Sequence, residues 1–515
     1  MRHEPLPPTP GPAPSGEADL LLRGGRILTL DARDSTAEAL AVRGGRIIAV
    51  GGERELSRLA GRHTRVVDLD GGAAIPGIND SHLHGAWLGA MWPRTLFGAA
   101  DSGAPNPLGA PNLPDGRNDA GTGATELGLT EPGPDVEQRL LHSEADREAA
   151  LLAAGRIAAS FGITSYTEPG LGPGENAGPT GCFGEEVLAT YRRLAADGRL
   201  TARITVLMLY GLLDGPSRLA DFEAGLASLP AGPAGGRPHG PAERLLRVAG
   251  VKIFADGIPP MRNAWIHGCY PDGTHGTPLT DGATEEARAA SLRAMIQAAH
   301  ARGLQVGVHA TGDRSIDAFI DAVAEAGKGY GDLRHYVIHG DLVGEAALRR
   351  LAGLGMGLNT QAAIALHTGD LLVGTLGRQA AAAAWPLRAA LAAGVPLALS
   401  SDAPVTTPDW RLGLAAADEW MGDAGDPRAR MGELLRCYTA AGAWQDHAEA
   451  YKGTLEVGKV ADIAVLEADP YALAPADMPD VAVLHTVFDG RLIHSRDEIH
   501  GRDEAAVNSA AANLR

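Results

Sequence analysis

Cysteine is scarce in this sequence. Only Cys182, Cys269 and Cys437 occur among 515 residues, far apart and without a CxxC pair. This spacing excludes a cysteine-based zinc cluster and is typical of a reducing compartment without structural disulfides. No apolar run reaches the length that a membrane helix needs, and the first residues, MRHEPLPPTPGPAPSGEAD, lack the apolar segment of a secretory signal. We therefore expect a cytoplasmic protein with no membrane partner.

Positive charge and aromatic side chains are also in short supply. Lys and Arg number 45 against 63 Asp and Glu, which gives a formal net charge of −18. This balance argues against a nucleic-acid partner, because the chain as a whole repels phosphates. Aromatics make up 4% of the residues, so the core has to be built mostly from aliphatic side chains. The composition is otherwise that of an ordinary globular protein, and we expect a small-molecule substrate.

The two ends of the chain share a β-rich texture. Residues 19–75 and 451–500 contain short apolar runs separated by glycine-containing turns, such as ALAVRGGRIIAVGG and VLHTVFDGRLIHS. The two ends are expected to form one small β-sandwich-like domain, although two unrelated β units remain the alternative. Residues 1–18, dense in proline, are expected to be a disordered tail, and residues 501–515 a second tail.

Residues 76–450 alternate strand-like and helix-like segments, which predicts a (β/α)8 TIM-type barrel. A doubly wound open sheet is the competing α/β fold, but no glycine-rich phosphate loop follows the first strand. The segment at about 93–141 is too long for a simple loop and is expected to be an insertion beside the site. The eight expected strands are AAIPGINDSHLH, ITSYTEP, ARITVLMLY, VAGVKIFADG, LQVGVHATGD, RHYVIHGD, MGLNTQA and PLALSSDAP.

Polar residues occur at the ends of five of these strands, where a barrel places its catalytic groups. They are His82, His84, Lys252, His309, His339 and Asp402. Imidazole and carboxylate groups are good ligands for zinc and neighbouring ions, so their convergence indicates a metal site. Each residue also has a simpler explanation. His82 and His84 could be a surface pair at a strand end, and His309 and His339 could be hydrogen-bonded core residues. Lys252 could pair with Asp256 or reach solvent, and Asp402 could cap a helix.

The order and context of these residues resemble the metal-dependent amidohydrolase superfamily. PGINDSHLH, VKIFADG, VHATGDRSID, VIHGD and SSDAP are similar to motifs of its amidohydrolase-3 branch, which includes N-substituted formamide deformylases. The chain departs from the branch at Ile78 and Asn79, where Phe and an aliphatic residue are usual, and in the loop that follows VKIFADG. We expect Asn79 to have a packing or supporting role, because it does not share a face with His82 on a regular strand.

The resemblance implies a binuclear metal centre. His82, His84 and Asp402 would bind one ion, and His309 and His339 the other. Lys252 would carry a CO2-derived carbamate that bridges two zinc ions, with manganese, iron or nickel as alternatives. A water held by the ions would attack the substrate, while Asp402 takes up its proton and delivers it to the leaving nitrogen.

The expected function is hydrolysis of a C–N bond in an amide, formamide or cyclic amide. A metal-dependent deaminase, a decarboxylase or another lyase is the alternative on the same scaffold, and a non-catalytic barrel is a third possibility. The loops after the fourth and seventh strands are expected to form the substrate wall. Its candidate residues are Arg262, Asn263, Trp265, His267, Tyr270, Gln361 and His367. The resemblance is compatible with a homodimer, and the sequence leaves the oligomeric state open.

Overall fold

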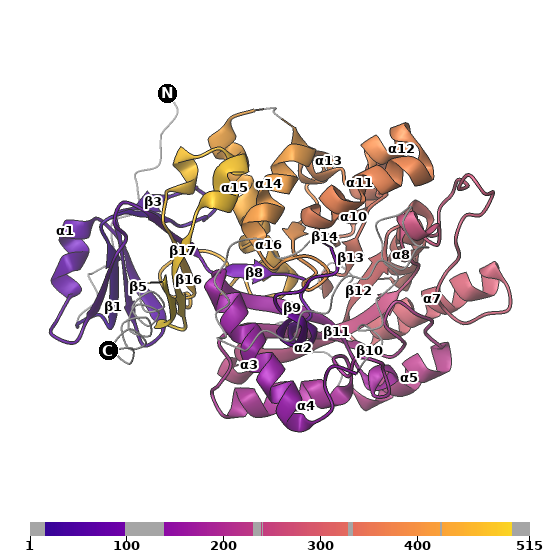
Figure 1. Ribbon diagram of the computed structural model, residues 1–515, viewed down its shortest axis with the longest axis horizontal. Helices are drawn as coiled ribbons and strands as arrows, with labels where there is room; N and C mark the ends of the chain where they lie inside the picture. The colour runs from indigo at the N-terminus through magenta and orange to yellow at the C-terminus, as the bar shows by residue number, and fades with distance from the viewer. Residues whose placement is uncertain are drawn as a thin grey trace, which may run out of the picture.

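A parallel eight-stranded sheet forms the centre of the protein in the computed structural model (Figure 1). The structure describes residues 16–97, 139–229, 238, 240–327, 333–422 and 425–496. The expected (β/α)8 barrel is confirmed, and each of the eight expected segments overlaps one of its strands. In sheet order these are β8 (Ile78–Asp80), β9 (Ile163–Leu171), β10 (Arg203–Leu209), β11 (Leu246–Phe254), β12 (Gln305–Ala310), β13 (Tyr336–His339), β14 (Gly357–Thr360) and β15 (Leu397–Leu399).

The barrel closes between its first and last strands, just beyond their carboxyl ends. Leu83 and Ala403 form a parallel bridge there. The Asp402 amide donates to the carbonyl of His82 at 2.8 Å, and the His84 amide donates to the carbonyl of Ala403 at 2.9 Å. The backbone that closes the barrel is therefore the backbone that carries three of the expected ligands.

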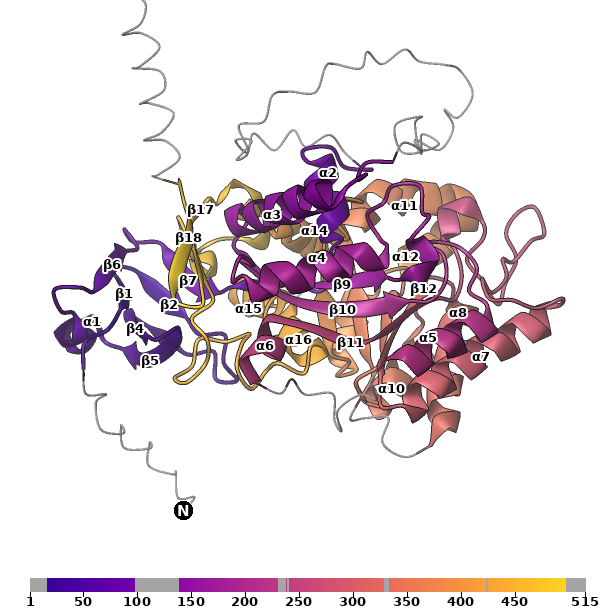
Figure 2. The ribbon, with the colours of Figure 1, turned by 90° about the horizontal axis from the view of Figure 1, so that it is seen from below.

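Helices cover the outer side of the sheet (Figure 2). The larger described ones are α2 (Gly85–Met91), α3 (Glu144–Ser160), α4 (Glu185–Ala196), α5 (Leu219–Ser228), α7 (Glu285–Ala301), α8 (Asp313–Ala326), α10 (Glu345–Gly353), α11 (Ala362–Leu376), α14 (Trp410–Met421) and α15 (Pro427–Cys437). Ser143 and Asp146 form a capping box that starts α3. In the described part of the chain, no helix combines the length and the apolar character needed to cross a bilayer.

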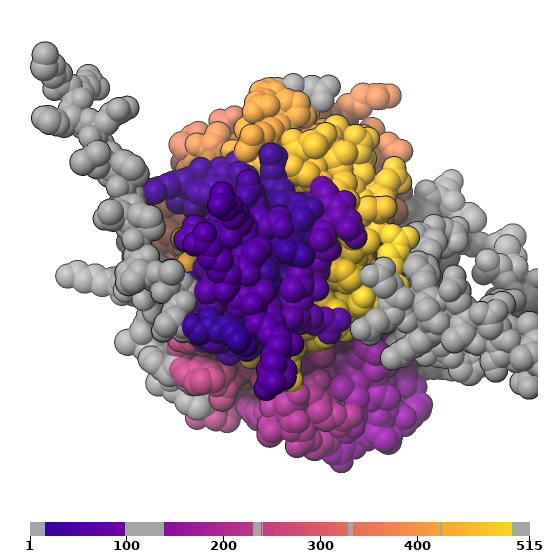
Figure 3. All heavy atoms as spheres, turned by 90° about the vertical axis from the view of Figure 1, so that its left-hand side faces the viewer, coloured from indigo at the N-terminus to yellow at the C-terminus, as the bar shows by residue number. Residues whose placement is uncertain are grey.

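Two further sheets lie beside the barrel and draw strands from the ends of the chain (Figure 2). In the space-filling view, the indigo N-terminal and yellow C-terminal segments lie side by side (Figure 3). One contains β5 (Arg46–Gly51), β4 (Ala39–Arg43), β1 (Leu20–Arg23) and β6 (Arg65–Asp68). The other contains β18 (Arg491–Ser495), β17 (Val483–Phe488), β16 (Ile463–Leu466), β7 (Ala73–Pro76), β2 (Arg26–Leu28) and β3 (Thr36–Ala37). The chain ends thus build the expected small β-domain together. The expected tails at 1–18 and 501–515 and the insertion at 93–141 lie wholly or largely outside the described residues.

The first expected strand is in fact two strands that belong to different sheets. β7 pairs with β16 in the small domain, whereas β8 pairs with β9 in the barrel. Gly77 separates them, and a Cβ atom there would lie 2.1 Å from the Thr164 hydroxyl oxygen. Glycine therefore lets the chain pass directly against the barrel wall as it crosses from one sheet to the other.

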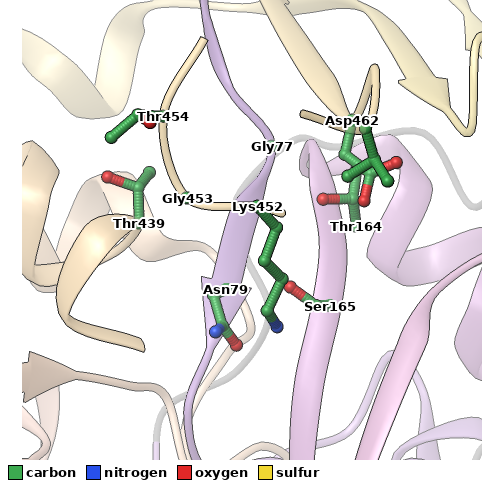
Figure 4. Close-up of a pocket in the computed structure, with 10 residues that line it drawn as sticks. Gly77, Asn79, Thr164, Ser165, Thr439, Lys452, Gly453, Thr454 and Asp462 are labelled. Carbon is green, nitrogen blue, oxygen red and sulfur yellow. The ribbon is translucent and has the colours of Figure 1, made fainter. Parts of the chain in front are cut away.

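Lys452, which forms a buried ion pair, lies near Asn79 where the small domain meets the barrel (Figure 4). The Lys452 ammonium lies 2.6 Å from the Asp446 carboxylate, which also accepts hydrogen bonds from Asn79 at 2.9 Å and Thr167 at 3.2 Å. A cavity of about 10 Å³ adjoins Lys452, enough for roughly one water molecule. Asn79 therefore supports the start of the barrel, which is the kind of role expected from its position in the sequence.

Candidate metal centre and active site

The six expected ligands all come from the carboxyl-end side of the barrel. His82 and His84 follow β8, Lys252 and His309 lie in β11 and β12, His339 ends β13, and Asp402 follows β15. All are buried except His339, which is partly exposed. The structure thus brings residues that are up to 320 positions apart to one mouth.

Asp402 lies at the centre of this group. Its Oδ1 atom is 3.2 Å from Nε2 of His82 and 3.3 Å from Nε2 of His84. The His82 and His339 ring centres are 5.3 Å apart, and those of His309 and His339 are 4.5 Å apart. One donor atom each from His82, His339 and Asp402 lies within 4.8 Å of the others. This trio combines residues that the resemblance assigns to two different ions.

The hydrogen bonds of the histidines leave nitrogen atoms available for a metal. Nδ1 of His84 lies 3.3 Å from the Glu168 carboxylate, and Nδ1 of His339 lies 2.7 Å from the Gln361 side-chain oxygen. Nε2 of His309 lies 3.0 Å from the carbonyl oxygen of Gly257. Metal-binding histidines are usually oriented in this way, through the ring nitrogen that does not bind the ion.

Two buried polar atoms in the described part of this site have no hydrogen-bond partner: Oδ1 of Asp402 and Nδ1 of His82. A buried carboxylate oxygen that lacks a donor is costly in free energy, and a bound cation removes that cost. The donor set of imidazoles and one carboxylate suits zinc and neighbouring divalent ions. The residues present therefore fit a metal centre.

The pKa values of His82, His309 and Asp402 favour the ionisation states in which these side chains bind a cation. Burial lowers the pKa of His82 to about 4 and that of His309 to about 3, so both are neutral near pH 7 and can act as ligands. Burial opposes charge on Asp402, but His82 and His84 hold the pKa of its carboxyl well below the usual value. For His84, the negative charges of Asp402 and Glu168 outweigh burial and raise the pKa to about 9, so this ring is protonated near pH 7 in the metal-free protein, and a metal bound at its Nε2 would displace that proton.

Lys252 is 1% exposed, and its ammonium nitrogen lies 4.6 Å from the centre of the Phe254 ring. Among the described residues, no ion pair joins it to Asp256, the partner considered in the sequence. Asp256 instead accepts hydrogen bonds from the amides of Trp265, Thr311 and Gly312. Burial lowers the pKa of Lys252 to about 8, against the attraction of Asp402. The amine is therefore much easier to deprotonate than an exposed lysine.

Glu168 was not identified from the sequence, although it is the last residue but one of the expected second strand, ITSYTEP. It is 1% exposed and accepts hydrogen bonds from the Gly85 amide at 2.7 Å and the Tyr191 hydroxyl at 2.9 Å. His84 is its third partner, so Glu168 orients both the His84 ring and the backbone of the next residue, Gly85. The available signal was a carboxylate at a barrel strand end, where a charged residue is rarely buried without a purpose.

Of the five expected substrate residues in the loop after β11, two are buried and three are exposed. Trp265 and Tyr270 are buried, and the Tyr270 hydroxyl donates to the carbonyl of Ala264. Arg262, Asn263 and His267 are exposed. Arg262 pairs with Asp272 at 3.2 Å and His267 with Asp317 at 3.0 Å, while the Asn263 side chain accepts from the Ile258 amide.

The two expected substrate residues after β14 also differ in their surroundings. Gln361 is 2% exposed and bonds His339, Asn359 and Ser400, which makes it a support for the ligand cluster. His367 is exposed on α11 and stacks on Phe97, with ring centres 5.9 Å apart.

Comparison with known proteins yields consistent matches along most of the chain. The model of the amidohydrolase family matches residues 105–494. YtcJ of Bacillus subtilis (strain 168) is 26% identical over 540 residues, which cover 92% of this chain and 99% of that protein. N-substituted formamide deformylase of Arthrobacter pascens is 26% identical over 556 residues, covering 93% and 98%. An uncharacterized metal-dependent hydrolase from Pyrococcus furiosus shares the fold, with a TM-score of 0.64 and 21% identity over 88% of this chain and 99% of that one.

Proposed function

This chain belongs to the amidohydrolase family, and from that premise we propose that it hydrolyses a C–N bond of a small amide, formamide or cyclic amide with the help of divalent metal ions. The observation that carries the proposal is the buried Asp402 Oδ1, which faces His82 and His84 but has no hydrogen-bond partner among the described residues. The resemblance seen in the motifs is confirmed by the family match, and it makes the protein a hydrolase.

The ligand residues would hold the metal, with His82, His84, His309, His339 and Asp402 as its donors. A metal in this position makes a water molecule more acidic and polarises a carbonyl group. Glu168, Gln361 and the Gly257 carbonyl hold three of the rings in orientation before any ligand arrives. Burial of the cluster keeps competing bulk water away from the reacting bond.

Asp402 is the group that moves the proton. The attacking water adds its oxygen to the carbonyl carbon and gives a proton to Oδ1 of Asp402. The C–N bond then breaks, and Asp402 returns the proton to the departing nitrogen, so that an acid and an amine are formed. The position of Oδ1 at the centre of the cluster supports this role.

For Lys252 we propose a carbamate. Its neutral amine would form an N–C bond to CO2 and release one proton to solvent, which would turn the side chain into an anionic ligand for the proposed pair of zinc ions. The support is physical: the amine is buried and its pKa is lowered to about 8 by that burial. An amine must be neutral to react with CO2, and burial favours the neutral form.

The experiment combines metal analysis with a substrate screen. The protein is loaded with Zn²⁺ or Mn²⁺ and incubated with N-acyl, N-formyl and cyclic amides, and the release of amine is measured. We expect turnover in one class and its loss, by at least about a thousandfold, in Asp402→Asn, with metal content checked in both proteins. Ammonia or CO2 release without cleavage of any amide would instead support the deaminase or lyase alternative.

A further inference from the structure

A cavity at the amino ends of β10 and β11 is lined by residues of the barrel and of the small β-domain together. On the barrel side, Arg203 begins β10, and the short helix α6 (Gly240–Leu245) leads directly into β11. On the side of the small domain, Arg46 begins β5 and Arg491 begins β18. The metal ligands lie at the opposite, carboxyl ends of the barrel strands, so this cavity is separate from the candidate active site.

The cavity is large enough for a small organic molecule. Its volume is about 350 Å³, which is room for roughly ten water molecules and lies within the range of small-molecule sites. Part of its wall is apolar and comes from Leu200, Leu245, Val460 and Phe488. We name it the arginine cavity after the four guanidinium groups that line it, those of Arg46, Arg203, Arg244 and Arg491.

Positive charge exceeds negative charge in the arginine cavity. Asp489 is the only carboxylate among the described residues that line it. Arg203 pairs with this carboxylate at 3.1 Å and with the buried Asp462 at 2.7 Å. The other three arginines have no ion pair among the described residues. Four guanidinium groups therefore face two carboxylates, in a protein whose net charge of −18 otherwise repels anions.

Arg244 has unused hydrogen-bonding capacity. No described residue accepts a hydrogen bond from its side chain, and its Nε atom is buried. A buried N–H group without an acceptor is costly in free energy, and an oxyanion in the cavity would remove that cost. The acidic residue next to it in the chain, Glu243, is not among the described residues that line the cavity.

The arginine side chains are held in position by neighbouring groups. The Cζ atom of Arg244 lies 5.0 Å from the centre of the Tyr451 ring, and that of Arg203 lies 5.0 Å from the centre of the Phe488 ring. Arg46 donates to the carbonyl of Gly458 at 3.4 Å. Donors that are already ordered lose less conformational freedom when a ligand binds, which favours affinity.

We propose that the arginine cavity binds a small phosphate monoester, that is, a phosphate group carried by an apolar organic body. Such a phosphate has a charge of about −1.5 to −2 at pH 7 and three acceptor oxygens, which matches the surplus of two positive charges. Guanidinium groups suit phosphate oxygens, and the apolar wall at Leu200 and Phe488 receives the organic part. A carboxylate offers the same oxyanion chemistry with one charge and two oxygens. The proposal is independent of amide hydrolysis, because none of these residues belongs to the metal centre.

Calorimetric titration of the metal-loaded protein with phenyl phosphate, inorganic phosphate and benzoate tests the class of ligand. We expect phenyl phosphate to bind with a dissociation constant of roughly 10 μM to 1 mM. Inorganic phosphate should bind about tenfold more weakly, because it leaves the apolar wall in contact with water. Benzoate should also bind at least about tenfold more weakly, because it has one charge and fewer acceptor oxygens. The same titrations of the metal-free protein exclude binding at the metal centre.

The variants Arg244→Gln and Arg491→Gln each remove one guanidinium group, from the barrel side and from the small-domain side. Each should weaken the binding of phenyl phosphate by about 10- to 100-fold, as the loss of a charge-assisted hydrogen bond predicts. Arg192→Gln on α4 and Arg54→Gln in the small domain are matched controls, because both arginines are exposed and lie outside the cavity. Both controls should keep the wild-type affinity.

The melting temperature gives a second readout. A ligand that contacts both the barrel and the small domain binds the folded protein alone, so saturating phenyl phosphate should raise the wild-type Tm by about 2 to 4 °C. The shift should disappear in Arg491→Gln, whose exposed position makes the substitution compatible with folding.

Four results would overturn the proposal. One is an absence of binding up to about 10 mM phenyl phosphate. Another is equal affinity in the wild type and both cavity variants, or binding that vanishes when the metal is removed, since the phosphate would then lie elsewhere. An equal loss in the cavity variants and the controls would show nonspecific attraction. Benzoate that binds as tightly as phenyl phosphate would make the ligand a carboxylate. None of these results bears on amide hydrolysis, which is measured by amine release.

Discussion

Replacement of Glu168 by glutamine should weaken metal binding without unfolding the protein. The carboxylate lies 3.3 Å from Nδ1 of His84 and accepts from the Gly85 amide and the Tyr191 hydroxyl. A glutamine of the same shape has one oxygen in place of two. Gly85 and Tyr191 both donate to Oε2, so the glutamine oxygen can keep both contacts, but its amide nitrogen then points a donor at the donor of His84.

The magnitude follows from that single lost contact. Removal of the group that orients a ligating histidine usually costs 10- to 100-fold in metal affinity, or about 1.4 to 2.7 kcal/mol. The hydrogen bonds from Gly85 and Tyr191 can be kept, so we expect the free energy of unfolding of the metal-free protein to fall by only about 1 to 3 kcal/mol.

Competition between the protein and a coloured chelator for Zn²⁺ measures the affinity, and urea denaturation of the metal-free protein measures the stability. Glu186→Gln is the matched control, because Glu186 is exposed and pairs with Arg147 on the neighbouring helix at 2.7 Å. Wild-type zinc affinity in Glu168→Gln would refute the reasoning, since His84 would then need no oriented partner. Equal loss in both variants would show a nonspecific effect of removing negative charge.

Three further predictions concern buried groups. Lys252→Ala should halve the bound metal and abolish turnover, as measured by elemental analysis and amine release, because a shared ligand is lost; two retained ions would contradict a bridge. Burial lowers the pKa of His335 to about 3, where its Nδ1 accepts from the Val306 amide at 2.9 Å. As the pH is lowered, the unfolded chain takes up a proton at this histidine before the folded protein does. The contribution of His335 to the free energy of unfolding is therefore complete above about pH 6.5 and falls by about 1.4 kcal/mol for each pH unit from there down to about pH 3. Urea titrations of His335→Asn should lack this pH-dependent part. Lys452→Met leaves the Asp446 carboxylate buried and unpaired, and should lower the free energy of unfolding by about 3 to 5 kcal/mol in the same titration, whereas a loss below about 1 kcal/mol would contradict a strong pair.

Much of the fold could be predicted from the sequence because each barrel strand is a short apolar run bounded by turn residues and polar ends. The polar residues at the strand ends also allowed the site to be predicted, because the carboxyl ends of parallel strands lie on one face of the barrel. His309 in VHATGD and Asp402 in SSDAP could therefore be placed together although 93 residues separate them.

The parts that escaped prediction depend on contacts between distant segments. Residues 73–78 form one apolar run, and only the pairing of β7 with β16 shows that it divides at Gly77. Gln361 is a polar residue in a loop at the barrel mouth, which is typical of a substrate contact, but its side chain instead forms a hydrogen bond with His339. Glu168 was overlooked because its partner, the His84 ring, lies 84 positions earlier in the chain.

The pairing of β7 with β16 also limits how early the small β-domain can finish folding during synthesis. β7 leads through Gly77 into the first barrel strand, and its partner strand β16 is synthesised almost four hundred residues later. While the chain leaves the ribosome, the start of the barrel is therefore attached to an unpaired strand edge. A chain that ends before Ile463 would have every expected metal ligand but would leave that edge exposed, ready to pair with another molecule.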